Sequence, residues 1–303
     1  MRIYLAGMVQ GGHLLRVNSG SENMQITESK TRTYPWDLES YHYVRKSNAP
    51  LEYMRKIKRS MFLDSGAFSM FTQGIKVDLS EYAAYIKKNQ DIIHISSNLD
   101  IIGRDNEQGT WNNQKILEKM GAKIQPVHHA RDDDKWLLKY IAEGYDYIFL
   151  GGMVPETTNY IRGWLDHLFS RYLTTKSGRA KIKVHGFGMT TLDLIKRYPW
   201  ASVDSISWVI TGRFGSIYLD LPHKDTKITF SSDSPKRKAF DQHYETLDPV
   251  TQRAVRTRVE ELGYDVKLLQ THYGWRDHFN IAFFDRIQQR PDPVFKLRET
   301  SLF

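Results

Sequence analysis

The stretch KIQPVHHARDDDKWLLKYIAEGYDYIFLGG (residues 123–152) decides the fold class. Its first and last segments are β-prone, and the segment between them, DDDKWLLKYIAEG (132–144), has apolar residues at helical spacing. Asp132 to Asp134 place negative charge where the helix begins, and Gly144 is a typical helix end. A strand, a helix and a strand at this spacing pair in parallel through a right-handed crossover. The stretch therefore predicts one βαβ unit.

The same alternation continues from the first residue to about residue 210. We predict strands at residues 2–7, 40–44, 61–65, 92–98, 123–129, 145–152, 181–188 and 202–208. We predict helices at residues 51–60, 78–90, 110–121, 132–144, 156–173 and 190–199. This α/β pattern favours a (β/α)₈, TIM-like barrel over an open doubly wound sheet.

The pattern changes after the barrel segment, so we expect a barrel domain at residues 1–210 and a C-terminal extension at residues 211–303, packed on the barrel. SIYLDL and KITFSS predict a β-hairpin around PHKDT (222–226), and SSDSPKRKAFDQH (231–243) reads as a polar loop. Helices are expected at residues 251–263 and 275–289.

Composition excludes several classes of protein. The 303 residues include 43 Lys+Arg and 35 Asp+Glu, a net charge of +8, and no cysteine. Disulfides, thiolate nucleophiles, iron–sulfur clusters and cysteine-ligated zinc are therefore excluded, and we expect no cofactor. No apolar run approaches the roughly 18 residues of a membrane span, and the apolar part of residues 1–15 is too short for a secretory signal. We expect a cytoplasmic protein that does not bind membranes.

Two basic clusters stand out, at residues 45–59 and 171–183. Each is either a solvated helix face or a contact surface for a phosphate backbone, and the positive net charge favours the second interpretation. The backbone-binding candidates are Arg45, Lys46, Arg55, Lys56, Lys58, Arg59, Arg179 and Lys181.

In a barrel, the polar residues at the C-terminal ends of strands form the active site. Candidates here are Asp64, Ser65, Gly66, Asn98, Asp100, Gly151, Gly152, His185, Gly186, Phe187 and Asp204. The glycines would let a planar ligand approach the backbone or would serve only as turns, and the phenylalanine would stack on a base or belong to the core.

Asp204 is the strongest candidate, because a carboxylate inside a strand-like run is costly to bury without partners. Its alternative role is to bind loop amides. Asp64, followed by Ser-Gly, would serve chemistry or an Asx-type turn. Two carboxylates across a barrel mouth suit chemistry at a sugar carbon, in which one attacks the carbon and the other moves a proton.

His128, His129 and the acidic residues Asp132 to Asp134 resemble a metal site at first sight. Consecutive histidines on a strand point to opposite faces, however, and the aspartates also fit a helix start. Phosphate-loop, HExxH and GxSxG motifs are absent, which disfavours the corresponding hydrolases.

Taken in order, FLDSGAFS, SSNLD, LGGM, VHGFGMTTLDLI and SVDSISW, within about residues 60–215, resemble the tRNA-guanine transglycosylase superfamily. Within it, the chain is most similar to the short phage-type enzymes that place 7-deazaguanine bases in DNA. The resemblance implies that Asp204 is a covalent nucleophile, that Asp64 handles a proton, and that Asp100 reads the base. It also implies base contacts from the backbone of Gly151, Gly152 and Met153, and a nucleic-acid contact from Arg213.

The resemblance thus implies a DNA-guanine transglycosylase, a pentosyltransferase that exchanges a flipped guanine in duplex DNA for a base such as 7-cyano-7-deazaguanine. If the chain is phage-encoded, it would act in the host cytoplasm. The tRNA enzymes hold a structural zinc with three cysteines and a histidine, and this chain has no cysteine. The zinc subdomain is therefore missing or replaced, which favours DNA over tRNA.

Two further interpretations remain open. An RNA-acting transglycosylase or a nucleoside or base hydrolase would keep the same fold. A nucleic-acid-binding barrel without catalytic activity would also keep it, although the presence of both Asp64 and Asp204 argues against that alternative.

Overall fold

A computed structural model describes residues 1–8, 21–75, 77–103, 105–153, 156–189 and 191–297. Residues 9–15 of the amino-terminal stretch and Thr190, where a helix was predicted to begin, lie outside the described residues. The described chain forms two compact units, the first from residues 1–8, 36–205 and 291–297, and the second from residues 21–35 and 206–290. We expected one division, between residues 210 and 211, whereas each unit combines separate segments of the chain.

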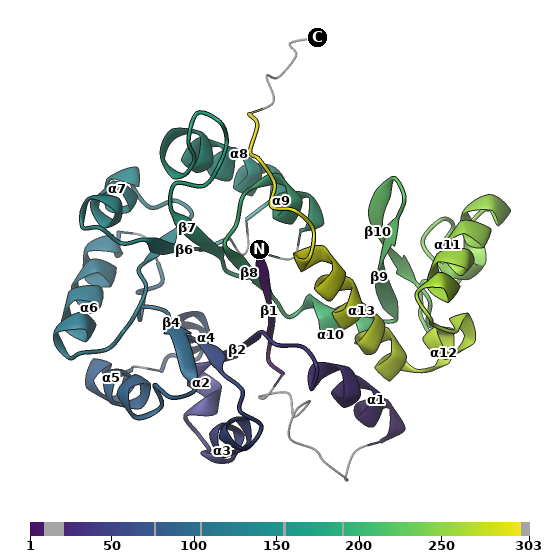
Figure 1. The fold of residues 1–303 in the computed structure, drawn as a ribbon, viewed down its shortest axis with the longest axis horizontal. Coiled ribbons are helices and arrows are strands. Elements are labelled where there is room, and N and C mark those ends of the chain that lie inside the picture. Colours follow the sequence, from purple (N-terminus) through teal and green to yellow (C-terminus); the bar gives the residue numbers. More distant parts are fainter. Residues whose placement is uncertain (9–20, 76, 104, 154–155, 190, 298–303) are drawn as a thin grey trace. The chain divides into compact units, whose positions relative to one another are not determined.

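The first unit contains eight parallel strands (Figure 1). They are β1 (Arg2–Ala6), β2 (Asp37–Ser40), β3 (Met61–Asp64), β4 (Ile93–Ser96), β5 (Val127–His129), β6 (Tyr147–Gly151), β7 (Lys183–Gly186) and β8 (Ser202–Ser205). Their order is β4-β3-β2-β1-β8-β7-β6-β5, so strands that follow one another in sequence are paired except for β4 and β5, the two edges, and β1 pairs with β8. Ser97 and Gln125, which follow β4 and precede β5, form a parallel bridge between the two edges. The unit is therefore a (β/α)₈ barrel, as predicted.

Large side chains fill the interior of the barrel. Tyr4, Leu38, Phe62, Val127 and Phe149 come from five strands and form one buried cluster. Phe62 and Phe149 lie 5.0 Å apart between ring centroids, and Tyr4 meets Phe62 edge-on at 5.3 Å. The interior is a packed core rather than a pore, as is usual for this fold.

The second strand was predicted wrongly. We expected it at residues 40–44, but β2 ends at Ser40 and the β-prone residues after it form the short helix α2 (Tyr41–Val44). The true strand was concealed because it carries two acidic residues, and the buried Asp37 forms an ion pair with Arg59. The other seven predicted strands each contain an observed strand.

Helices surround the sheet in the first unit (Figure 1). They are α2, α3 (Ala49–Lys56), α4 (Ala67–Thr72), α5 (Leu79–Lys88), α6 (Glu107–Lys119), α7 (Asp134–Ala142), α8 (Thr158–Leu168), which continues as a π-helical turn (Phe169–Leu173), and α9 (Leu192–Arg197). The predicted start of α7 is confirmed, because the Asp133 side chain accepts a hydrogen bond from Lys135 N at 2.9 Å. Gly144 has a φ of 85° directly after this helix, as a helix end requires.

The second unit is built on the long helix α13 (Tyr273–Gln288), which contacts α1 (Glu22–Thr31) and α10 (Ser207–Arg213). The second unit also contains β9 (Ser216–Leu221), β10 (Lys224–Thr229), a 3₁₀ turn (Tyr244–Thr246), α11 (Pro249–Glu261) and α12 (Val266–Thr271). The antiparallel hairpin of β9 and β10 is confirmed, although β10 begins at Lys224 rather than at Lys227. α1 had no counterpart among the predicted elements.

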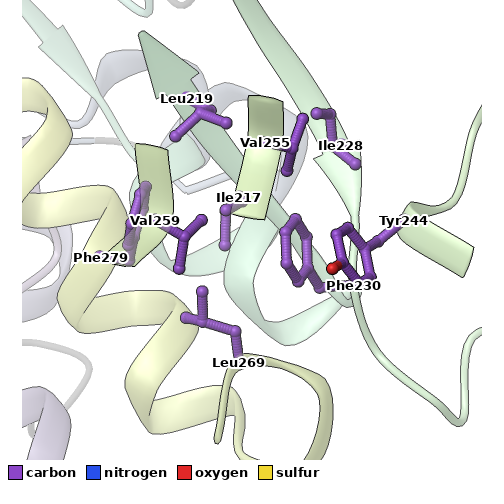
Figure 2. Packing of buried hydrophobic residues seen from close by; sticks show 9 residues of the cluster. All are labelled: Ile217, Leu219, Ile228, Phe230, Tyr244, Val255, Val259, Leu269 and Phe279. Atoms are coloured by element: carbon purple, nitrogen blue, oxygen red, sulfur yellow. The ribbon is translucent and has the colours of Figure 1, made fainter. Parts of the chain in front are cut away.

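Figure 2 shows the core of this second unit. Apolar residues from the hairpin face residues from the C-terminal helices, and Phe230 stacks on Tyr244 at 4.9 Å between ring centroids. The cluster comprises Ile217, Leu219, Ile228, Phe230, Tyr244, Val255, Val259, Leu269 and Phe279. Among the described residues, no helix is both long enough and apolar enough to cross a membrane.

Candidate active site

The candidate site lies at the carboxyl-terminal ends of the barrel strands. Asp64 is the last residue of β3, Asp204 lies near the end of β8, and Asp100 follows β4. Because the strands are parallel, their carboxyl-terminal ends meet at one mouth of the barrel. The charges of Asp100 and Asp204 both act on Asp64. The fold thus brings together the three aspartates selected from the sequence.

The carboxyl group of Asp64 binds its proton more tightly than an ordinary aspartate does. Burial of the carboxyl group, together with the negative charges of Asp100 and Asp204, raises the pKa of Asp64 to about 7. Its Oδ2 accepts a hydrogen bond from Gly66 N at 2.9 Å, so the Asx-type turn is also present. Gly66 has a φ of +74°, and a Cβ there would lie 2.5 Å from Ser40 Oγ. Asp64 is therefore held in place and close to half protonated at neutral pH.

Asp100 forms a close pair with His129, the last residue of β5. His129 Nε2 lies 2.7 Å from Asp100 Oδ2, and Ser65 Oγ donates to Asp100 Oδ1 at 3.2 Å. Burial opposes protonation of His129, but the hydrogen bond and charge of Asp100, with further help from Asp132, raise the pKa of the imidazole. Asp132 also accepts a hydrogen bond from His129 N at 2.8 Å. Asp100 is thereby held between His129 and Ser65, next to an imidazole whose pKa is raised.

The two oxygens of Asp204 have different surroundings. Its side chain is 10% exposed, and Oδ1 accepts a hydrogen bond from Gly188 N at 2.8 Å. His185 Nε2 lies 3.3 Å from the same oxygen. Among the described residues, Oδ2 has no hydrogen-bond partner. It is not fully buried either, so it is accessible. One oxygen is fixed while the other remains available. The loop-amide role considered for Asp204 is thus present, but it occupies only Oδ1.

Two of the predicted base-binding residues support the loops around the site. Ser65 is buried, and its backbone N–H donates to Ser97 Oγ at 2.8 Å. Asn98 is also buried, and its Nδ2 donates to the carbonyl of Thr110 at 2.8 Å. The side chain of Asn98 thus anchors α6 to the loop after β4.

The two glycines at the end of β6, Gly151 and Gly152, make room for His129. A Cβ on Gly151 would lie 2.9 Å from His129 Cδ2, and a Cβ on Gly152, whose φ is +66°, would lie 2.9 Å from His129 Cβ. Met153, which follows them, is buried. The requirement for glycine here comes from the neighbouring strand, and Gly152 itself is exposed.

The residues at the end of β7 lie against the interior of the barrel. His185 is fully buried, its Nδ1 lies 2.6 Å from Ser202 Oγ, and its ring meets that of Phe187 at 4.8 Å between centroids. Phe187 also meets Phe149 edge-on at 5.5 Å and packs on the interior cluster. Gly186 is buried, and a Cβ there would lie 3.1 Å from the Trp200 ring. Phe187 thus belongs to the core, and His185 contacts Asp204 rather than the open mouth.

Most of the basic candidates lie at the opposite end of the barrel. Arg55 forms two hydrogen bonds with Asp91, which precedes β4, and Arg59 pairs with Asp37 at the start of β2. Lys56 and Lys58 precede β3, and Arg179 and Lys181 precede β7. The amino-terminal ends of parallel strands lie away from the mouth that holds the aspartates. These six basic residues therefore do not line the candidate site.

Three other basic candidates have different positions. Arg45 and Lys46 follow α2, on the side of the mouth, where they lie over the rings of Tyr41 and Tyr43 at 5.5 and 5.6 Å. Arg213 belongs to the second unit. Its Nε donates to Asp277 Oδ2 at 3.2 Å, and its guanidinium lies 4.3 Å from the centre of the Tyr273 ring. In this structure, Arg213 has a structural ion pair.

The consecutive histidines of β5 point to opposite faces, as predicted. His129 reaches Asp100, whereas the fully buried His128 stacks on Trp164 of α8 at 6.1 Å between ring centroids. In the described part of the chain, no three His, Asp or Glu side chains converge to hold a metal ion.

Comparison of the chain with protein-family models and with curated proteins found no match in either set.

The residue that sequence reasoning missed is His129, which it considered only as a metal ligand. Its position offered a signal, because it ends a barrel strand, as Asp64 does.

Proposed function

We propose that the chain is a DNA-guanine transglycosylase that exchanges guanine for a 7-deazaguanine base through a covalent glycosyl-aspartate. The observation that carries this proposal is the pairing of Asp204, which has one fixed and one available carboxylate oxygen, with Asp64, whose pKa is about 7. A nucleophile and a group able to give or take a proton at neutral pH are what base exchange at a sugar carbon needs. The substrate class comes from the resemblance to the transglycosylase superfamily.

In the first half of the reaction, Asp204 Oδ2 attacks the anomeric carbon of the target nucleotide. The bond between that carbon and guanine breaks, and its electron pair goes to the base. Protonated Asp64 gives its proton to the departing guanine. The products are free guanine, ionised Asp64 and a sugar joined to Asp204 by an ester, with the phosphate backbone intact.

The second half reverses these roles. Ionised Asp64 removes a proton from the incoming 7-deazaguanine, whose nitrogen attacks the anomeric carbon and displaces Asp204. A group with a pKa of about 7 suits both halves, because each of its protonation states is well populated at neutral pH.

Asp100 is the proposed reader of the base. As a carboxylate it accepts hydrogen bonds only, so it matches the N–H donors on the edge of a guanine-like base. The pairing with His129 and the hydrogen bond from Ser65 hold its side chain in place. Arg45 and Lys46 are the proposed phosphate contacts, because the other basic candidates of the barrel lie at its opposite end.

The proposal is tested by incubating the full chain with duplex DNA and a labelled 7-deazaguanine base, followed by mass spectrometry of the nucleosides. We expect the label to enter DNA and one guanine to leave for each base that enters. Asp204→Asn, which keeps the size of the side chain, is the control and should incorporate no label.

Three results would overturn the proposal in distinct ways. Guanine released without replacement would indicate a hydrolase, and label entering RNA rather than DNA would indicate an RNA enzyme. DNA binding without either reaction, under any supply of base, would favour a binding protein.

A further inference from the structure

Four polar groups lie in a row inside the barrel and end at Asp204. Tyr147 of β6 places its hydroxyl 2.6 Å from Ser202 Oγ of β8, and Ser202 Oγ lies 2.6 Å from His185 Nδ1 of β7. His185 Nε2 lies 3.3 Å from Asp204 Oδ1. His185 is fully buried among the rings of Phe62, Phe149 and Phe187, so the row is shielded from solvent.

The protons in this row can be placed by counting donors and acceptors. Burial lowers the pKa of His185, although the hydrogen bond and charge of Asp204 oppose it, so the imidazole is neutral and has one N–H. Burial raises the pKa of Tyr147 to about 12, so its hydroxyl keeps its proton. Ser202 has one proton to donate, and the carboxylate of Asp204 only accepts.

Two proton arrangements satisfy the hydrogen bonds of Ser202, and the approach of His185 Nε2 to Asp204, an electrostatic contact without hydrogen-bond geometry, decides between them. In the favoured arrangement, Tyr147 donates to Ser202, Ser202 donates to His185 Nδ1, and the single N–H of His185 lies on Nε2, on the side of Asp204. In the reverse arrangement, the lone pair of Nε2 would face a carboxylate oxygen 3.3 Å away, which is repulsive.

We propose that His185 is the positioning residue of Asp204: its Nε2–H, oriented by Ser202 and Tyr147, joins Gly188 N in holding Oδ1 so that Oδ2 faces the substrate. This inference rests on the proposed function, because it assigns the attacking oxygen. The hydrogen bond from Gly188 N and the electrostatic attraction of the nearby Nε2–H act on the same oxygen, and together they restrict the rotation of the carboxylate. When the ester has formed through Oδ2, the same donors remain on the carbonyl oxygen, and they stabilise the carboxylate again when the second base displaces it.

The first test uses no substrate. In ¹⁵N-histidine NMR spectra of the full chain, we expect His185 to be neutral with its proton on Nε2. Ser202→Ala removes the donor to Nδ1, so the His185 signals should shift toward a mixture of tautomers, while those of His128, which is remote from this row, stay unchanged. A proton on Nδ1 in the wild-type protein would overturn the inference.

The second test compares two variants of His185 in DNA exchange. His185→Gln retains an N–H donor near the position of Nε2, whereas His185→Phe suits the aromatic surroundings and has none. We expect His185→Phe to slow formation of the covalent intermediate about 100-fold, with KM for the incoming base unchanged, and His185→Gln to recover most of the rate. Equal rates for the two variants would overturn the inference.

The two tests separate the possible failures. If the wild-type chain shows no exchange, the proposed function fails, and the NMR spectra still decide whether His185 presents a donor to Asp204. If exchange occurs but the spectra show the other tautomer, only the positioning role fails.

Discussion

The barrel mouth contains two Asp–His pairs, Asp100–His129 and Asp204–His185, whose histidines differ in charge. Both imidazoles are heavily buried, which by itself lowers the pKa of histidine. His129 lies 2.7 Å from Asp100 and also feels Asp132 and Glu107, so its pKa is raised. For His185, Asp204 at 3.3 Å is the residue that opposes the effect of burial, and burial prevails, so the pKa of His185 is lowered.

The difference teaches that a short hydrogen bond to the paired carboxylate, with further carboxylates nearby, decides whether the pKa of a buried histidine is raised or lowered. His129, whose pKa is raised, orients Asp100 through a 2.7 Å contact, which suits recognition of hydrogen-bond donors. A neutral His185 gives Asp204 one directed hydrogen without cancelling its charge, which suits a nucleophile. Under the proposed function, one pair recognises the base and the other orients the attacking oxygen.

The largest effect is expected from removing the carboxylate of the second pair. Asp204→Ala should lower the rate of base exchange by about 10⁴-fold or more, because no ester with the sugar can form. The measurement is incorporation of labelled base, together with a search by mass spectrometry for a protein–DNA adduct in the wild-type chain. If Asp204→Ala incorporated label at the wild-type rate, Asp204 would not be the nucleophile.

Asp64 lies between the two pairs, and its replacement is expected to have the next largest effect. Asp64→Asn should lower exchange about 100-fold and abolish the pH dependence near 7. In the wild-type chain, adduct formation should slow as pH rises above about 7, since it needs protonated Asp64, and capture of the incoming base should slow as pH falls below it. Stopped-time assays of each half-reaction measure both limbs.

Stability provides the control for this variant. Asp64 ionises with a pKa near 4 in the unfolded chain but near 7 in the folded protein. As pH rises from 4 to 7, the folded wild-type protein therefore loses stability relative to the unfolded chain. Asp64→Asn removes this cost, so its stability relative to wild type should increase from pH 4 to pH 7 and then stay constant. Above pH 7, we expect Asp64→Asn to be more stable than wild type by about 2 kcal/mol in urea unfolding. This figure is discounted for the partial exposure of Asp64 and for the lost bond to Gly66.

His129→Gln tests the first pair and should change a different kinetic parameter. Without His129, Asp100 loses the charge-assisted hydrogen bond that orients it, so KM for the incoming base should rise about tenfold, in line with about 1.5 kcal/mol for such a bond. The value of kcat should change less than threefold. If this variant instead lowered kcat with KM unchanged, as expected for His185→Phe, the two pairs would not have separate roles.

The sequence was informative wherever a pattern repeats. Seven of the eight strands were located because β-prone runs alternate with helical spacing, and Asp64, Asp100 and Asp204 followed from the rule that strand ends form the mouth. β2 escaped because Asp37 and Glu39 interrupt its apolar pattern, and both are buried. Burial of charged groups depends on partners such as Arg59, which local pattern does not reveal.

Other features depended on spatial neighbours. His129 is recognisable as a site residue only once Asp100, from the loop after a different strand, is seen beside it. His185 was expected to contact a base, but the register of β7 and β8 places Ser202 opposite it and directs its ring inward. The basic clusters could have been placed from the sequence, since residues that precede a strand lie away from the mouth.

Two glycines, one beside each pair, are expected to affect stability rather than the chemistry. Gly152 and Gly188 share a left-handed backbone, with φ of +66° and +60°, so alanine is strained at both. At Gly152, a new Cβ would lie 2.9 Å from His129 Cβ and 3.1 Å from Ala130 N, whereas at Gly188 nothing lies within 4 Å. We expect Gly188→Ala to cost about 1 kcal/mol of unfolding free energy and Gly152→Ala about 2 to 3 kcal/mol.

Because the strain is shared, the difference between the two alanine variants isolates the crowding around His129. The NMR signal of His129 should shift in Gly152→Ala and stay in place in Gly188→Ala, where the backbone N–H still donates to Asp204. Equal destabilisation, with His129 unmoved in both variants, would mean that the first pair is not held by the close packing of β5 against β6. Its charge would then depend on the neighbouring carboxylates alone, without a fixed distance to Asp100.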